Sequence, residues 1–140
     1  GVSTGGHAFR VDGATELRTD LVVDTGGGTV SFGPRAPIDS QSNTTRRLVI
    51  DAGSGSAFFA AGIGTRTELG GFEVTRAESG VTFGTVNGPD LGIHATGRVE
   101  FGVGASVITG TGVTFRSDSV AVTTTGDIVG RKLRKRYARF

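Results

Sequence analysis

Side chains suited to chemistry are few in this sequence of 140 residues, and no group of them has the spacing of a known reactive motif. Cysteine is absent, which excludes thiolate metal ligands and cysteine nucleophiles. The only histidines are His7 and His94, and both lie in segments typical of strands or turns. His94 follows an apolar triplet, as Asp24 and Asp51 do elsewhere, so we interpret it as a polar turn residue and not a metal ligand.

The carboxylates also favour structural roles. Asp24 and Asp51 each precede a glycine-rich turn, where an aspartate side chain accepts a hydrogen bond from the backbone two residues on. Nothing marks any two acids as the pair that glycoside hydrolysis needs. Residues 25–29 (TGGGT) lack the lysine of a phosphate-binding loop. We therefore predict no catalytic residue, no metal site and no cofactor.

Positive charge is concentrated at the C-terminal end. Residues 131–140 contain six cationic side chains and no acid, whereas residues 1–130 contain nine arginines and 13 acids. The net charge of +2 therefore hides a body with a formal charge of −4. This distribution argues against a broad basic surface that binds a specific nucleic acid. No apolar run approaches the roughly 20 residues that cross a bilayer, so we predict no transmembrane segment.

The basic end forms a separate segment, residues 129–140. Val129, Leu133, Tyr137 and Phe140 recur at the spacing of one helix face, which indicates a short C-terminal helix; a frayed, solvated tail is the alternative. Such a segment suits acidic polysaccharide, lipid headgroups or nucleic acid. Our candidates for assembly or partner contact are Arg131, Lys132, Arg134, Lys135, Arg136, Tyr137, Arg139 and Phe140.

The rest of the chain, residues 1–128, has an all-β composition. Its many valines and threonines favour strands, and the chain's 25 glycines favour turns. A Val-x-Phe triplet or near variant recurs five times after a glycine, and alternation places its first and third residues on one face. A second apolar triplet precedes four copies, at residues 21–23, 48–50, 72–74 and 91–93. The predicted core ladder is Phe32, Phe59, Phe83, Phe101 and Phe115.

Stacking of such units predicts a β-solenoid, because one unit of short strands cannot bury its apolar face alone. The uneven spacing of the phenylalanines leaves an antiparallel sandwich as the alternative. Residues 33–45 contain two prolines and a polar run, which predicts a loop extending from one coil. We expect one domain, residues 1–128, followed by the basic tail, residues 129–140.

Residues 48–84, LVIDAGSGSAFFAAGIGTRTELGGFEVTRAESGVTFG, resemble repeats of large bacterial surface proteins of the filamentous-haemagglutinin and autotransporter-adhesin kind. Residues 3–21 are similar to the neighbouring element of those arrays, and the likeness covers about residues 3–122. The resemblance implies a right-handed parallel β-helix, here of about six short coils, and an extracellular structural or adhesive role.

We therefore expect a secreted or cell-surface structural or adhesive subunit that is not an enzyme. It is expected to self-assemble head to tail into a filament or surface layer, and to contact anionic polysaccharide or a cell surface. The alternative is a carbohydrate-binding or polysaccharide-cleaving β-helix module. An ice-binding solenoid is a third class, for which residues 123–125 and scattered Val-Thr-Phe triplets are the only threonine pattern.

Overall fold

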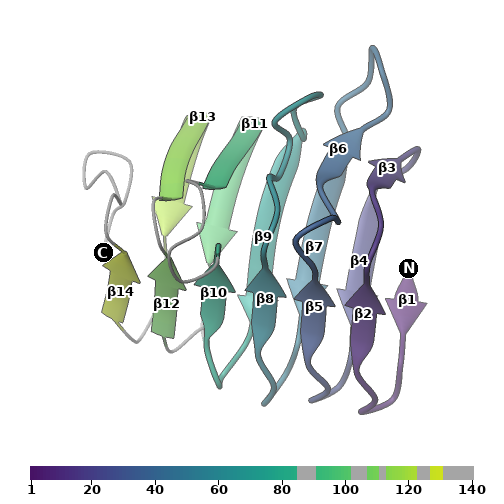
Figure 1. Ribbon diagram of the computed structural model, residues 1–140, viewed down its shortest axis with the longest axis vertical. Coiled ribbons are helices and arrows are strands. Elements are labelled where there is room, and N and C mark those ends of the chain that lie inside the picture. The colour runs from purple at the N-terminus through teal and green to yellow at the C-terminus, as the bar shows by residue number, and fades with distance from the viewer. Residues whose placement is uncertain (85–90, 102–106, 111–112, 123–126, 131–140) are drawn as a thin grey trace.

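The computed structural model (Figure 1) describes residues 1–84, 91–101, 107–110, 113–122 and 127–130, with the side chains of residues 1–84, 93–96, 99 and 100. All regular secondary structure in these ranges is β-strand, which confirms the all-β prediction. The strands are β1 (Val2–Ser3), β2 (Phe9–Val11), β3 (Thr15–Leu17), β4 (Leu21–Asp24), β5 (Val30–Phe32), β6 (Ile38–Ser40), β7 (Arg47–Asp51), β8 (Ala57–Phe59), β9 (Gly71–Arg76), β10 (Val81–Phe83), β11 (Leu91–Phe101), β12 (Val107–Gly110), β13 (Val113–Val122) and β14 (Asp127–Gly130).

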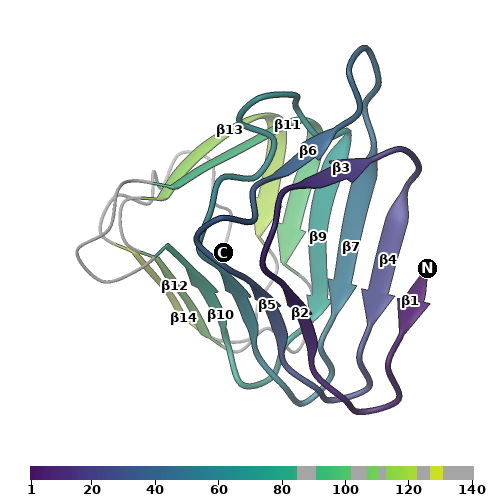
Figure 2. The ribbon, with the colours of Figure 1, turned by 45° about the vertical axis from the view of Figure 1, so that its right-hand side comes forward.

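The strands stack as a parallel β-solenoid, as predicted, and not as a sandwich. A rear sheet has the order β1-β4-β7-β9-β11-β13, and a front sheet has the order β2-β5-β8-β10-β12-β14. A short third side contains β3 and β6. In Figure 1 the chain descends through the rear sheet, ascends through the front sheet and advances from right to left, which is a right-handed coil. Figure 2 shows the two sheets facing each other, with β3 and β6 along the top.

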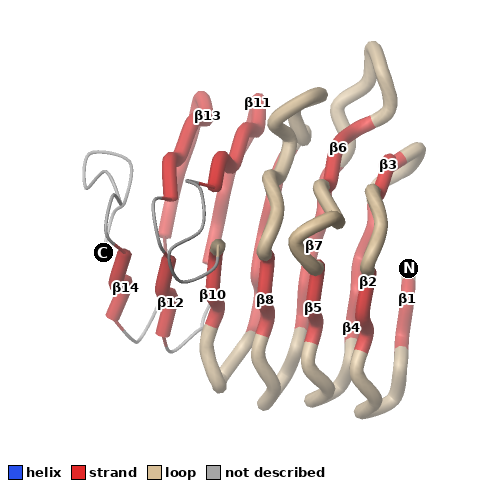
Figure 3. Tube along the Cα trace, viewed as in Figure 1, coloured by secondary structure: helices blue, strands red, loops and turns tan. Residues whose placement is uncertain are grey.

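The core consists of side chains that alternate inward along each short strand. In β5, Val30 and Phe32 are buried, and the first and third residues of β8 and β10 are buried in the same way. β8 lies one coil and β10 two coils beyond β5 in the front sheet (Figure 3). The register aligns Phe32 with Phe59, and Phe59 with Phe83. Their rings stack with centroids 5.5 and 5.4 Å apart. This arrangement fills the interior behind the front sheet with one continuous aromatic column.

The predicted ladder of five phenylalanines is wrong at Phe101 and Phe115. Phe101 ends β11 and pairs with Val74 in the rear sheet. Phe115 lies in β13 opposite Ile93. The front-sheet strand after β10 is β12, which contains no phenylalanine. A Val-x-Phe triplet suits any side of the solenoid, so its recurrence does not by itself place all copies on the same side.

The prediction of a loop over residues 33–45 is also wrong in its central part. β6 pairs in parallel with β3, and isolated bridges continue this side from Ile38 to Ile63 and from Ile63 to Ile93. Ala36 and Ile38 are each only 1% exposed. Removing residues 36–43 would therefore remove part of the buried core, because Pro34 and Pro37 precede a strand, β6, and do not mark a loop in its place.

The turns between the rear and front sheets follow the predicted chemistry. Asp24 Oδ1 accepts a hydrogen bond from the Gly26 N–H (3.0 Å), and Asp51 Oδ1 accepts one from the Gly53 N–H (2.9 Å). At Gly28 the neighbouring coil is so close that a Cβ would overlap a carbonyl group of that coil. A Cβ at Gly55 would likewise overlap the backbone of the preceding coil, so tight stacking requires glycine before the triplets of β5 and β8.

The solenoid extends beyond the predicted boundary at residue 128. β14 pairs in parallel with β12, and its Val129 lies opposite Thr109. Val129 is therefore a strand residue and not the first position of a tail helix. The candidate contact residues of the tail, residues 131–140, lie outside the described residues.

Candidate functional site

The backbone N–H groups of both histidines donate hydrogen bonds to backbone carbonyl groups. The His7 N–H donates to the Thr4 carbonyl, and the His94 N–H donates to the Ile63 carbonyl one coil away. His94 does not occupy the turn position of Asp24 and Asp51 as predicted, because residues 99–101 continue the rear sheet beside β9. His94 instead follows Ile93 on the third side, next to Ile63. Within the described ranges, no group of three or more histidine or acidic side chains is placed to hold a metal ion.

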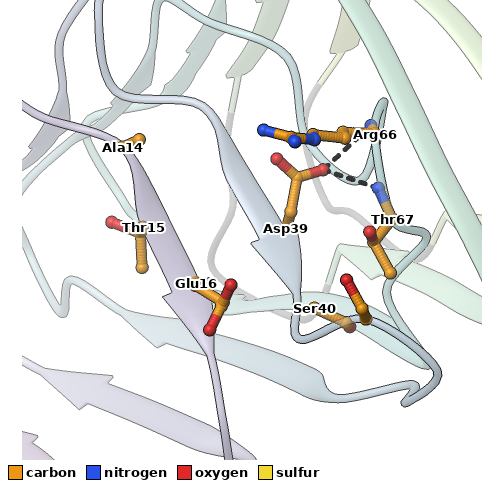
Figure 4. Close-up of a pocket in the computed structure, with 8 residues that line it drawn as sticks. Ala14, Thr15, Glu16, Asp39, Ser40, Arg66 and Thr67 are labelled. Carbon is orange, nitrogen blue, oxygen red and sulfur yellow. Dashed lines mark hydrogen bonds between the residues drawn. The ribbon is translucent and has the colours of Figure 1, made fainter.

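A polar notch of about 210 Å³ lies on the third side of the solenoid (Figure 4). Glu16 of β3 and Asp39 of β6 are register partners, so two carboxylates extend from adjacent positions into this region. Arg66 and Thr67 of the next coil complete the notch. Paired carboxylates beside a hollow are what glycoside hydrolysis requires, so the bonds that each carboxylate makes decide its role.

Both carboxylates have hydrogen-bond partners, but only those of Asp39 belong to the next coil. Asp39 Oδ1 accepts hydrogen bonds from the backbone N–H groups of Arg66 and Thr67, each at 2.9 Å. Arg18 Nε donates to Glu16 Oε1 at 3.2 Å. Asp39 thus fixes the turn of the following coil, and the notch is better explained as a side-chain cap than as a catalytic pair.

Replacing Asp39 with alanine is expected to lower the free energy of unfolding by about 1 kcal/mol, because two backbone N–H groups lose their acceptor. Asp39→Asn retains an acceptor oxygen and should keep most of that stability. Urea unfolding followed by circular dichroism measures both variants. Equal losses for the two would show that the charge of Asp39, and not its capping oxygen, is the stabilising feature.

A larger groove, of about 560 Å³, lies over the outer face of the front sheet. Its floor crosses β2, β5 and β8, where Arg10, Ser31 and Phe58 are register partners that alternate with the buried core residues. Pro34 contributes to the lining from the turn that follows β5. The charged side chains among its lining residues are Arg10 and Asp12, which form an ion pair at 2.9 Å.

Phe58 is an exposed aromatic side chain on this face. It is 42% exposed, although its ring is large and apolar. Its register partners on the neighbouring strands are Ser31 and Thr82, which are small and polar. The sequence shows the signal, because residues 57–59 are the only one of the five triplets with an aromatic middle residue. In the predicted core ladder this triplet contributes only Phe59, so the outward position of Phe58 is not used there.

The first coil presents a different kind of surface, an open strand edge. β1 and β2 are the end strands of the two long sheets, and β3 lies beside them in the same coil. Within the described residues, no strand pairs with their outer edges. Val2, Phe9 and Val11 pack against the core but remain only partly buried. This end of the solenoid therefore offers both apolar surface and backbone groups that strand pairing leaves free.

No family model, curated protein or solved structure matches this chain. Among the described residues, no helix is both long and apolar enough to span a membrane. The candidates for function are the first coil and the groove at Phe58, together with the basic residues 131–140 singled out by the sequence.

Proposed function

We propose that this chain is a structural or adhesive β-solenoid unit outside the cell that stacks end to end with further copies of itself. The observation that carries the proposal is the open first coil, where β1, β2 and β3 end their sheets together. Such edges pair readily with another strand unless they are blocked. The partly buried Val2, Phe9 and Val11 gain from the same contact, because a further coil would cover them.

A second copy suits this edge because the coils repeat in shape. In the rear sheet Leu21 lies opposite Leu48, and Leu48 lies opposite Phe72, so successive coils present the same outline to one another. The last coil of another copy can pair with the open edges of β1 and β2. This pairing would resemble that of β4 with β1 and of β5 with β2 within the chain. The two surfaces of such a joint differ, and joints of this kind extend into filaments unless their rotation closes a ring.

The charge distribution supports the same arrangement. Residues 1–130 carry a formal charge of −4, and residues 131–140 carry six cationic side chains. Opposite charges on the two parts favour contact between copies, and the basic segment equally suits an anionic polysaccharide on a cell surface. The extracellular location rests on the resemblance of residues 48–84 to surface-protein repeats. The proposal assigns no catalytic step to the chain.

Sedimentation velocity and negative-stain electron microscopy of residues 1–140 test the proposal. We expect species larger than a monomer whose size grows with protein concentration, and rod-shaped particles in the images. Added salt should reduce the association, because exposed charges are screened beyond about 10 Å at 0.1 M ionic strength. A monomer at every concentration in low salt would overturn the proposal.

A further inference from the structure

We infer that the groove over β2, β5 and β8 is a binding site for a short neutral oligosaccharide. Its volume of about 560 Å³ suits a small ligand, because such sites commonly measure roughly 300–1,000 Å³. The inference stands on the side chains of the outer face of the front sheet. It shares β2 with the open first coil, but it does not depend on the stacking of copies at that edge.

The aromatic side chain supplies the apolar half of the site. Phe58 is 42% exposed where the neighbouring coils have Ser31 and Thr82. An exposed phenylalanine contributes little to folding, and this one places apolar ring surface at the groove. A pyranose ring has one face of C–H groups and a rim of hydroxyl groups, so it can stack on such a ring while its rim stays polar.

The polar half of the site lies at the same register position on the two strands before β8, namely β5 and β2. Ser31 is one strand from Phe58 and Arg10 is two strands away, with steps of about 4.8 Å between strands. A sugar ring stacked on Phe58 therefore places its hydroxyl groups, or those of the next sugar unit, over the serine and the arginine. The Arg10–Asp12 pair is 75% and 70% exposed, so its N–H donors and carboxylate oxygens remain accessible to hydroxyl groups.

The charge of the groove favours a neutral glycan over an acidic one. Arg10 and Asp12 are the charged lining residues, and their charges offset each other across 2.9 Å. An extended peptide is also less suited to this floor. β5 is paired in parallel on both sides, with β2 and with β8, so its backbone groups are used within the sheet. Over β5 and β8, each of which is paired on both sides, recognition comes from side chains that stack and form hydrogen bonds, which is the chemistry of saccharide binding.

Isothermal titration calorimetry and saturation-transfer NMR test the site with defined probes. The neutral probes are cellotetraose, xylotetraose, mannotetraose and chitotetraose, with tetragalacturonate as the acidic probe and a proline-rich decapeptide as the peptide probe. At least one neutral probe should bind, with its ring protons closest to Phe58. Phe58→Thr gives β8 a small polar residue at the position where β5 has Ser31 and β10 has Thr82. This variant should weaken binding by about tenfold or more. Arg10→Ala should weaken it several-fold.

Val22→Thr is the matched control, because Val22 is an exposed apolar residue (47%) on the outer face of the other long sheet. It should leave saccharide binding unchanged. Circular dichroism and sedimentation should match the native chain for all three variants, which separates this site from end-to-end stacking. Binding of none of the neutral probes, preference for tetragalacturonate or the peptide, or full binding by both Phe58→Thr and Arg10→Ala would overturn the inference.

Discussion

Replacing Phe59 with alanine is expected to lower the free energy of unfolding by about 3–5 kcal/mol, the range for a fully buried phenylalanine. Phe59 is 1% exposed and lies at the centre of the aromatic column. Its ring stacks on those of Phe32 and Phe83, and it meets Phe72 edge-on with centroids 5.3 Å apart. The cavity left by alanine opens between two coils, so neither neighbouring coil can close it without losing its own contacts. Guanidinium unfolding followed by circular dichroism measures the loss.

Phe58 provides the control for that variant, because it differs from Phe59 by one position in the chain. Its side chain is on the outer face and 42% exposed, so Phe58→Ala should change the stability by about 1 kcal/mol or less. Similar losses for the two alanine variants would show that the register of β8 is not the one described. A larger loss for Phe58→Ala would mean that the inner and outer faces of β8 are exchanged.

The existence of the strands could be predicted from the sequence, but their assignment to sides could not. Alternation with period two identifies a strand and its buried face. It does not distinguish the sides of a solenoid, because every side needs the same apolar triplets. In the rear sheet Leu21, Leu48, Phe72 and Val99 follow one another at intervals of 27, 24 and 27 residues. The phenylalanine triplets obscure this period, because Phe101 and Phe115 lie on other sides than Phe83.

β11 shows why the misassignment arose. This strand runs from Leu91 to Phe101, and its residues serve two sides of the solenoid. Ile93 continues the third side through its bridge to Ile63, whereas Val99 pairs with Phe72 in the rear sheet. Residues 91–93 form an apolar triplet before Val99, which groups them in the sequence with residues 21–23, 48–50 and 72–74, the triplets of the rear sheet. No glycine-rich turn separates the two halves of this strand, so the sequence does not mark the corner.

The candidate sites also differ in whether the sequence could predict them. Phe58 could have been predicted from the sequence, because an aromatic residue stands at a middle position that alternation assigns to the outside. The cap formed by Asp39 could not have been, because the N–H groups that it binds belong to Arg66 and Thr67, about one coil later. Contacts between coils depend on the coil length, and the uneven spacing of the phenylalanines does not reveal that length.

Blocking the open edge of the first coil is expected to convert end-to-end assemblies into monomers. Thr4 N–H donates to the Asp24 carbonyl, and Phe9 N–H donates to the Thr29 carbonyl, so these residues bond toward the second coil. Because bonding direction alternates along a strand, the N–H groups of Ser3 and Arg10 point toward the open side. The double variant Ser3→Pro/Arg10→Pro removes both donors, and its rings obstruct an approaching strand.

Ser3→Ala/Arg10→Ala is the matched control, since it shortens the same two side chains but keeps both N–H groups. If strand pairing makes the joint, the alanine variant should sediment with the native chain, and the proline variant should sediment as a monomer with an unchanged circular dichroism spectrum. If the joint depends on the basic segment alone, deleting residues 131–140 should dissolve the assemblies, and the proline variant should leave them intact. Assemblies that persist in both the proline variant and the deletion variant would show that copies meet at neither surface.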